Sequence, residues 1–237
     1  MRDKPSVFVL IPAWNEEESL PLVLRDIPRD LVDRVIVCNN ASSDRTVEVA
    51  QRAGAVVVTS RRRGYGEACL SGMRYILGLP ASEQPDIAAF IDGDYSDYPE
   101  DLRSVVGRLI ADDLDLVIGS RTIGPMQKGA MTPPQRLGNW LAPAMIKLLF
   151  GVQFSDLGPM RAVKWQSLLA MDMQDRTYGW TVEMQVKAAK MGMRSGEVAV
   201  RYRKRAAGAS KVSGTIRGVV LAGWKIVTTI LRLWIAR

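Results

Sequence analysis

The sequence predicts an α/β fold, with a mostly parallel sheet that carries helices on both faces and a C-terminal amphipathic helix. Three observations lead to this prediction. Short apolar runs alternate with segments in which apolar residues recur at helical spacing. The short runs are apolar almost throughout, which is typical of parallel strands that helices cover on both sides. The chain has 237 residues, of which 47% are hydrophobic, enough for one large domain with a packed core.

The first 120 residues repeat a unit of one strand and one helix. In the first unit an apolar strand precedes Leu20 and Val23, which begin a pattern with helical spacing. In the second unit Ser43 or Asp44 can cap the helix. Strands are expected at residues 7–11, 34–38, 56–59, 87–91 and 115–118, and helices that begin near residues 20, 44, 66 and 99.

The pattern changes after residue 119. Residues 122–135 contain three prolines and two glycines, which predict a long irregular loop of the kind that often acts as a lid. No linker and no internal sequence repeat divides the chain. We therefore expect one catalytic domain at residues 1–213 and a separate helix at residues 214–237. The remaining expected elements are helices at 136–150 and 181–191 and a strand at 197–202.

The composition restricts the classes of function. A net charge of +7 favours an anionic partner, such as a nucleotide, a phospholipid surface or a nucleic acid. The absence of histidine excludes a histidine base, a triad that contains histidine and imidazole metal sites. Cys38 and Cys69 are expected to be buried and reduced, and the amino terminus lacks the features of a signal peptide. We therefore expect a cytoplasmic protein.

The most informative motif is an apolar strand that ends in two carboxylates, Asp92 and Asp94. Open α/β sheets bind ligands at the carboxyl ends of their strands. Hard oxygen ligands at that place suit Mg²⁺ or Mn²⁺ that bridges to a substrate phosphate. The alternative is a solvated acidic turn that caps the helix beginning at Pro99.

Three other strand ends carry polar turns. Residues 11–17 combine an aromatic ring with polar groups that could hold a nucleobase, although Asn15 could instead cap a helix. Residues 39–44 are similarly polar, and residues 61–67 place arginines and glycines before a helix, which suits a phosphate. The last turn matches neither the Walker pattern nor the dinucleotide fingerprint. P-loop hydrolysis and hydride transfer are therefore disfavoured.

Several motifs in order resemble glycosyltransferase family 2, whose members have the Rossmann-like GT-A fold. The resemblance rests on residues 11–16, 39–46, 64–66, 92–94 and 119–121. Three later stretches look like the dolichol-phosphate mannose synthase branch, which transfers sugars to polyprenyl phosphate: residues 156–161, 179–184 and 205–211. The matching motifs extend from about residue 7 to residue 215.

The resemblance implies a nucleotide-sugar site and a metal site. Asp92 and Asp94 match the metal-binding Asp-x-Asp motif. Where relatives have a further glutamine ligand this chain has Ser96, and Ser96 and the neighbouring Asp97 are additional candidate ligands. Asparagines at 39 and 40 stand where the family often has two aspartates, which leaves uracil or guanine open. The expected nucleotide-sugar residues are Pro12, Ala13, Trp14, Glu16, Asn39, Asn40, Asp44, Arg63, Gly66, Asp92 and Gly93.

The resemblance also implies cations that hold an acceptor phosphate: Arg121, Arg136, Arg205 and Lys211. The alternative for each is surface charge, and for Arg121 a structural salt bridge. A phosphate acceptor, with a second pKa of about 6, needs positioning more than deprotonation. A hydroxyl acceptor would need a carboxylate base, for which Asp156 or Glu183 is available. Together with Asp94 as the metal ligand that serves the leaving diphosphate, these are the expected catalytic residues.

The C-terminal segment has charges on one side and apolar residues on the other. At 100° per residue, Lys225 and Arg232 lie on one side, opposite Ile226, Leu233 and Trp234. No run of about 18 uncharged apolar residues is present to span a bilayer. Such a helix can lie in a lipid interface, or it can pack on the domain or on a second subunit.

The sequence therefore predicts a metal-dependent inverting glycosyltransferase that moves a hexose from a UDP- or GDP-sugar to dolichyl or undecaprenyl phosphate. We expect it to be peripheral on the inner face of the cell membrane, and a homo-oligomer remains open. The nearest alternative is transfer to a hydroxyl of a sugar, lipid or small metabolite. A regulatory protein without turnover is a further alternative, and a nucleic-acid partner is not expected.

Overall fold

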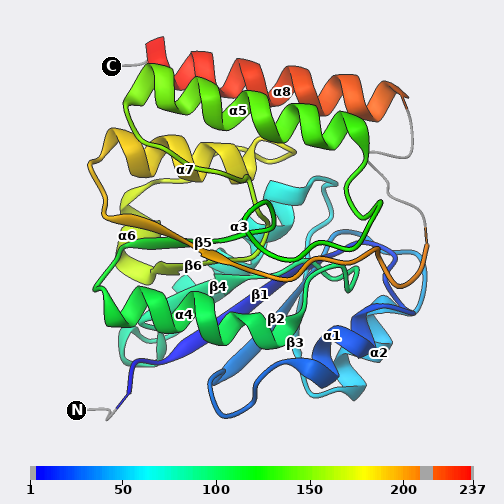
Figure 1. The fold of residues 1–237 in the computed structure, drawn as a ribbon. Coiled ribbons are helices and arrows are strands. Elements are labelled where there is room, and N and C mark those ends of the chain that lie inside the picture. Colours follow the sequence, from blue (N-terminus) through cyan, green and yellow to red (C-terminus); the bar gives the residue numbers. More distant parts are fainter. Residues whose placement is uncertain (1–3, 209–215, 236–237) are drawn as a thin grey trace.

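The computed structural model describes residues 4–208 and 216–235, and Figure 1 shows their arrangement. The centre is a seven-stranded sheet with the strand order β3-β2-β1-β4-β6-β5-β7. All neighbouring strands are parallel except β6, which is antiparallel to β4 and β5. The predicted α/β class is confirmed. The strands are β1 (Val7–Ala13), β2 (Arg34–Asn39), β3 (Val56–Thr59), β4 (Ile87–Phe90), β5 (Leu116–Ser120), β6 (Arg161–Lys164) and β7 (Ser195–Ala199).

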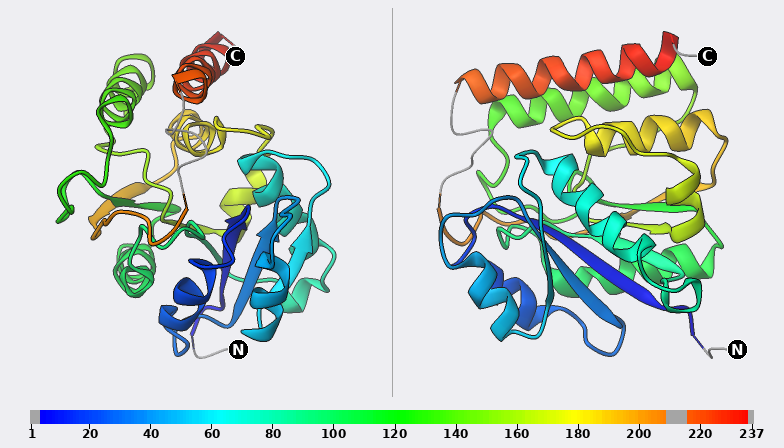
Figure 2. Two further views of the ribbon diagram at one scale, coloured as in Figure 1. Left: turned by 90° about the vertical axis from the view of Figure 1, so that its right-hand side faces the viewer. Right: turned by 180° about the vertical axis from the view of Figure 1, so that it is seen from behind.

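Helices cover both faces of the sheet, as Figure 2 shows. Helices α1, α2 and α4 contribute to the core on one face, and α3, α6 and α7 to the core on the other. The helices are α1 (Leu20–Asp26), α2 (Thr46–Arg52), α3 (Tyr65–Leu77), α4 (Leu102–Ala111), α5 (Pro133–Phe150), α6 (Trp165–Ala170), α7 (Trp180–Lys190) and α8 (Ile216–Ile235), with short 3₁₀ turns at Ala81–Glu83 and Pro99–Asp101.

The first strand shows how the sequence builds these two cores. Val7, Val9 and Ile11 point to the face covered by α1, α2 and α4. Phe8 and Leu10 point to the opposite face, because successive side chains of a strand alternate. An uninterrupted apolar run is therefore needed, and it is this run that marked β1 in the sequence.

Two elements were not expected from the sequence, β6 and α6. The strand β6 has only four residues and begins and ends with the cations Arg161 and Lys164, so no apolar run marks it. Arg161 is completely buried, and its guanidinium donates to the carbonyl oxygens of Leu157 and Thr181. These hydrogen bonds to backbone carbonyls allow the charged Arg161 to lie buried in the sheet.

Helices α5 and α8 lie side by side as an outer layer beyond α7 (Figures 1 and 2). Helix α5 begins at Pro133 rather than at residue 136. Thr132 and Gln135 form a capping box there, and proline is well tolerated in a first helical turn. The irregular loop before α5 is correspondingly shorter than expected.

The C-terminal helix packs on the domain through Ile226, Ile230 and Leu233. Packing on the domain is therefore confirmed for this side. The predicted division into one charged and one apolar side holds only in part. Trp234 remains half exposed whereas Ile226 and Leu233 pack inward, and Lys225 pairs with a buried carboxylate whereas Arg232 is exposed. Within the described residues, no helix is long and apolar enough to cross a membrane.

Candidate active site

A cavity of about 620 Å³ lies between the carboxyl ends of the strands and the layer formed by α5 and α8. The turn after β1, the acidic turn after β4 and Arg121 at the end of β5 form its sheet side. On the helix side it is lined by Gln135, Gly138 and Asn139 of α5 and by Ala222, Gly223 and Ile226 of α8. The cavity thus lies at the carboxyl edge of the sheet, the place where the sequence predicted a site in an open α/β fold.

The acidic pair forms one wall of the cavity. An oxygen of Asp92 accepts a hydrogen bond from the hydroxyl of Tyr65 at 2.9 Å. Asp94 accepts from the backbone nitrogen and the hydroxyl of Ser96, at 2.9 and 2.6 Å. Burial and the neighbouring charge of Asp94 raise the pKa of Asp92 to about 7. Two close carboxylates of this kind fit a divalent cation, which would neutralise both, although no group of three or more metal-ligating side chains occurs among the described residues.

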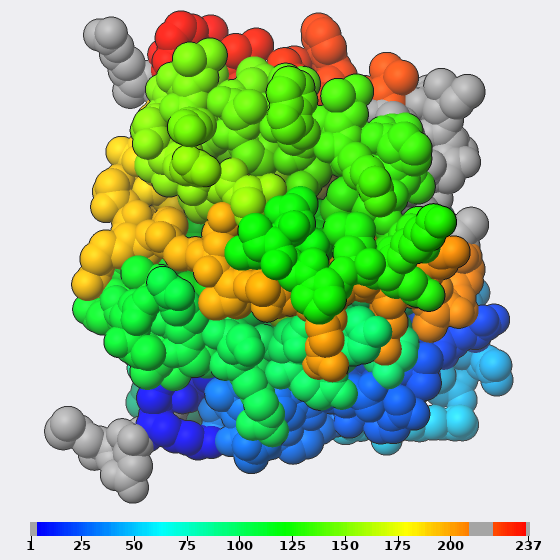
Figure 3. Space-filling view, in the orientation of Figure 1, coloured from blue at the N-terminus to red at the C-terminus, as the bar shows by residue number. Residues whose placement is uncertain are grey.

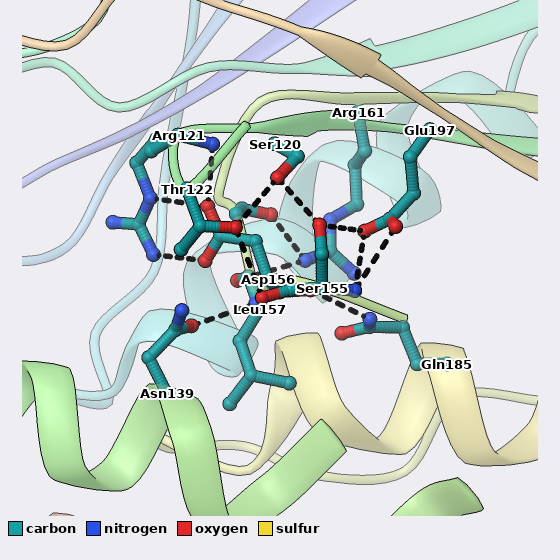
Figure 4. Close-up of polar contacts among 11 residues, drawn as sticks. Ser120, Arg121, Thr122, Asn139, Ser155, Asp156, Leu157, Arg161, Gln185 and Glu197 are labelled. Carbon is teal, nitrogen blue, oxygen red and sulfur yellow. Dashed lines mark hydrogen bonds and ion pairs between the residues drawn. The ribbon is translucent and has the colours of Figure 1, made fainter. Parts of the chain in front are cut away.

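Arg121 is held at the cavity wall by Asp156, as Figure 4 shows. Its backbone nitrogen, Nε and Nη2 donate to the two carboxylate oxygens at 2.7 to 2.8 Å. Although burial alone raises the pKa of Asp156, the charge and hydrogen bonds of Arg121 outweigh it and keep this pKa below its ordinary value. Asp156 is completely buried, so it positions Arg121 and has no free oxygen toward the cavity.

The same figure shows how the rest of this cluster is held together. The hydroxyl of Ser155 bonds to the hydroxyl of Ser120 at 2.7 Å, and its backbone nitrogen donates to Glu197 at 2.9 Å. Asn139 of α5 accepts from the backbone nitrogen of Leu157 at 2.8 Å. These bonds connect the end of β5, the segment before β6 and helix α5 in one polar network.

Glu183 is also fixed by structural contacts. Its oxygens accept from the backbone nitrogens of Gln174 and Asp175 at 3.0 and 2.6 Å, and Lys187 forms an ion pair with it at 2.9 Å. The side chain is completely buried and does not line the cavity. The expected role of Glu183 or Asp156 as a general base is therefore not supported by the geometry.

The turns after β1, β2 and β3 form a second wall. The guanidinium of Arg63 lies over the ring of Trp14, 4.6 Å from its centroid. Asn40 holds the arginine turn: its side-chain oxygen accepts from the nitrogen of Gly64 at 2.8 Å, and its amide donates to the oxygen of Gly64 at 3.0 Å. A flat aromatic surface next to a cation suits a nucleobase or a phosphate.

Arg205 crosses the mouth of the site. Its Nη2 donates to both carboxylate oxygens of Glu16, at 2.8 and 3.0 Å, and its Nη1 lies 4.0 Å from an oxygen of Asp94. Arg205 and Glu16 both line the cavity. A residue near the carboxyl end of the chain is thereby brought to the acidic pair.

The structure brings most of the predicted residues to the cavity. Those that line it are Pro12, Ala13, Trp14, Glu16, Asn40, Arg63, Asp92, Gly93, Asp94, Arg121 and Arg205. Those that lie behind or away from it are Asn39, Asp44, Gly66, Arg136, Asp156 and Glu183. Lys211 lies outside the described residues.

Four residues that were expected in the site do not line the cavity, and their contacts explain why. The side-chain amide of Asn39 donates a hydrogen bond to the hydroxyl of Thr59. Asp44 accepts one from the backbone nitrogen of Thr46 in the first turn of α2. Gly66 approaches another loop so closely that an added Cβ would lie 2.0 Å from the carbonyl oxygen of Asp175. Arg136 is exposed on the first turn of α5. These four residues shape the site or its surroundings rather than its lining.

Several lining residues were missed by sequence reasoning. Tyr65 lies between the two glycines of the motif at residues 64–66, from which the sequence predicted a site role only for Gly66. Tyr202 lies at the end of the strand expected at residues 197–202, and Thr177 lies in a segment without a distinct pattern; neither was expected in the site. Asp97, which the sequence offered as a candidate beside Ser96, does not line the cavity: it is completely buried, and neither of its oxygens has a hydrogen-bond partner among the described residues. Burial and the charge of Asp92 raise the pKa of Asp97 well above its ordinary value.

A sheet with an acidic pair in a cavity at its strand ends is the architecture of GT-A glycosyltransferases. The family model of glycosyl transferase family 2 matches residues 8–198. The chain belongs to this family and is a glycosyltransferase.

Relatives are similar over nearly the whole chain. An uncharacterized glycosyltransferase of Mycobacterium tuberculosis is 37% identical over 226 residues, which cover 94% of this chain and 98% of the relative. The undecaprenyl-phosphate mannosyltransferase of Micrococcus luteus is 32% identical, with coverage of 90% and 89%. The dolichyl-phosphate hexose transferase of Haloferax volcanii is also 32% identical, with coverage of 84% and 83%.

Solved structures confirm the fold. The glucosyl-3-phosphoglycerate synthase of Mycobacterium tuberculosis, crystallised with Mn²⁺, UDP and phosphoglyceric acid, has a TM-score of 0.74. Its identity is 22%, and the similarity covers 97% of this chain and 78% of the other. At this identity the likeness establishes the GT-A architecture.

Proposed function

We propose that the protein transfers a hexose from a UDP- or GDP-sugar to polyprenyl phosphate at a membrane surface, with Mg²⁺ or Mn²⁺ at Asp92 and Asp94. One observation carries this proposal. A single cavity joins the acidic pair to α5 and α8, and the sides of these helices that face away from the domain are apolar and exposed.

The sheet side of the cavity suits the donor. Trp14 offers a ring, Arg63 a cation, and Asp92 with Asp94 two carboxylates within one wall. These carboxylates would hold the divalent cation, which supplies a Lewis acid for the diphosphate leaving group. The named relatives with lipid-phosphate acceptors and the neighbour crystallised with Mn²⁺ and UDP support this assignment.

The cations of the cavity suit a phosphate acceptor. Arg121 is fixed by Asp156, so its guanidinium is preorganised, and Arg205 lies across the mouth. Guanidinium groups bind phosphate through paired hydrogen bonds. The polyprenyl phosphate is largely ionised near neutral pH and needs orientation more than a base. The buried state of Asp156 and Glu183 therefore agrees with a phosphate acceptor better than with a hydroxyl acceptor.

The sides of α5 and α8 that face away from the domain form a surface that we call the outer face. Trp140 and Leu148 of α5 are 68% and 83% exposed, and Trp224 of α8 is 70% exposed. Figure 3 shows the two helices along one edge of the molecule, with α5 in front. The outer face consists of Leu137, Trp140, Leu141, Leu148, Val220, Leu221, Trp224, Leu231, Trp234 and Ile235.

The outer face has the chemistry of a lipid-interface surface. Neither helix contains an acidic residue, whereas exposed cations such as Arg136, Lys147 and Arg232 accompany the apolar side chains. Tryptophan, leucine and basic residues together favour an anionic bilayer interface. We therefore place the enzyme peripherally on the cytoplasmic face of the membrane, next to the lipid acceptor. The two free buried cysteines agree with a reducing compartment.

The test is an assay of the purified protein with Mn²⁺, a panel of UDP- and GDP-hexoses and one acceptor at a time. The acceptors are polyprenyl phosphate in vesicles, its dephosphorylated alcohol and 3-phosphoglycerate. We expect sugar transfer only to polyprenyl phosphate. Equal transfer to the alcohol would establish a hydroxyl acceptor, and transfer to 3-phosphoglycerate alone would replace the lipid by a small metabolite.

A further inference from the structure

We infer that Lys225 of α8 is a positioning residue for the donor site, which it holds in place through an ion pair with Asp175. The Nζ of Lys225 lies 2.9 Å from a carboxylate oxygen of Asp175, whose side chain is completely buried. Lys225 itself is 38% exposed and belongs to the helix that carries six of the ten residues of the outer face. The ion pair therefore connects a surface helix with the interior.

Asp175 organises the loop that follows it. Its other oxygen accepts from the backbone nitrogen of Thr177 at 2.7 Å and from that of Gly179 at 3.1 Å. Thr177 and its neighbour Tyr178 line the cavity. One carboxylate thus fixes the loop at residues 175–179 through hydrogen bonds to its backbone.

The loop in turn holds the beginning of α3. The backbone nitrogen of Gly66 donates to the carbonyl oxygen of Thr177 at 3.2 Å, and the nitrogen of Glu67 donates to that of Arg176 at 2.9 Å. The approach is so close that a Cβ at Gly64 or at Gly66 would lie 2.0 Å from a carbonyl oxygen of the loop. Glycines are therefore required at both positions, which explains the glycines around Tyr65.

The last link reaches the acidic pair. Tyr65, between these two glycines, donates its hydroxyl to Asp92 at 2.9 Å. Arg63 of the same turn lies over Trp14. The position of the arginine turn, and with it the donor pocket, therefore depends on the loop that Lys225 anchors. A second contact between α8 and the loop supports this connection. An added Cβ at Gly179 would lie 2.8 Å from the hydroxyl of Thr229, so α8 packs directly on the loop.

Removing the cation is expected to loosen the donor pocket and to spare the chemistry. In Lys225→Met the buried Asp175 keeps its backbone partners and loses its counter-charge, so the loop gains alternative positions. We expect the KM for the nucleotide sugar to rise roughly tenfold, within the range typical of coupling between two sites, with kcat changed less than twofold. Lys225→Arg, which retains the charge, is expected to keep most of the wild-type affinity.

The experiment measures binding of UDP and GDP with Mn²⁺ by calorimetry, next to the kinetics, for the full-length wild type and variants. Arg232→Met is the matched control, because it removes an exposed cation from the same helix without touching the loop. Equal nucleotide affinity in wild type and Lys225→Met, or loss of affinity in the control as well, would overturn the inference. If Lys225→Met does not fold, Lys225→Gln and Lys225→Arg decide on the same criterion.

The inference rests on the proposed function only for the identity of the donor. A wild type that binds neither nucleotide removes both. A wild type that binds nucleotide but does not use polyprenyl phosphate removes only the proposed acceptor, and the comparison of Lys225→Met with its control remains decisive.

Discussion

The sheet side of the cavity, called here the sheet wall, and the side formed by α5 and α8, called the helix wall, are built in different ways. The sheet wall consists of turns at strand ends that hydrogen bond to one another: Asn15 accepts from the nitrogen of Ser43 at 2.8 Å, and the nitrogen of Glu16 donates to Thr46 at 2.8 Å. The helix wall includes Gly138 of α5 and Ala222 and Gly223 of α8, which have little or no side chain. A Cβ added to Gly138 would meet nothing within 4 Å. The sheet wall is therefore polar and fixed, whereas the helix wall leaves room.

This difference suggests a division of labour. Charges that recognise phosphate and metal need preorganised partners, which the strand ends provide. A long apolar acceptor needs space and contact with the bilayer, which the helix layer provides. The predictions below test each wall separately.

The largest effect is expected at the acidic pair. Asp94→Asn should lower the rate of nucleoside diphosphate release about a thousandfold, because a metal ion supplies several kcal/mol of charge stabilisation. The hydrogen bonds from Ser96 can remain, so the fold should persist. Asp112→Asn, an exposed carboxylate at the end of α4, serves as the control with normal turnover. Normal turnover in Asp94→Asn as well would contradict the metal assignment.

The second effect concerns the fixed cation of the sheet wall. Arg121→Ala leaves the buried Asp156 without its partner and should lower the free energy of unfolding by about 3–5 kcal/mol. Arg103→Ala breaks a pair whose side chains are 53% and 70% exposed and should cost less than about 1 kcal/mol. Urea unfolding measures both. Similar costs would show that Arg121 is not held as the structure indicates.

The third effect concerns the helix wall. Replacing Trp140 and Trp224 together by serine should lower binding to anionic vesicles at least about tenfold, because each large side chain gains roughly 1.5–3 kcal/mol on leaving water. Replacing Leu77 and Ile110, which are exposed elsewhere, is the matched control. Nucleotide binding should be unchanged in both variants. Unreduced vesicle binding would contradict the lipid contact of the outer face. A change from dimer to monomer in the variant would assign this face to a second subunit.

The same division explains what could be predicted from the sequence. The sheet wall was predictable because carboxyl ends of parallel strands meet at one edge, so polar residues after successive strands had to converge. Asp92, Asp94 and Trp14 were placed in this way. The roles of Asp156 and Glu183 were not predictable, because their partners are set by the antiparallel strand β6 and by the loop before α7, neither of which has a sequence pattern.

The helix wall could be predicted only in part. Hydrophobic spacing located α8, but it did not decide which apolar side would be buried, because this helix is apolar on two sides. Trp234 and Ile226 were therefore expected on the same side, whereas in the structure Trp234 is half exposed and Ile226 packs on the domain. The interaction of Lys225 with Asp175, 50 residues earlier, depends on tertiary packing and leaves no local signal.

The smallest effect is again expected at the sheet wall. It tests whether a residue that serves the metal site lowers the stability of the fold. Without metal, the burial of Asp92 and the nearby charge of Asp94 raise the pKa of Asp92 to about 7 from an ordinary 3.8. The folded state thus retains a proton that the unfolded state releases, and stability from this group falls as pH rises from about 4 to 7. Asp92→Asn is neutral throughout, can still accept from Tyr65, and should be more stable than wild type by roughly 1–2 kcal/mol at pH 8.

Thermal unfolding in EDTA at pH 5 and pH 8 measures this difference. The advantage of Asp92→Asn should be small at pH 5 and should grow toward pH 8. Adding Mn²⁺ with UDP or GDP should reverse the order, because bound ligands stabilise only the wild type. A variant that is less stable than wild type at both pH values would show that Asp92 supports the fold through its charge. In that case the acidic pair would stabilise the sheet wall, and it would not be a metal site that lowers the stability of the metal-free fold.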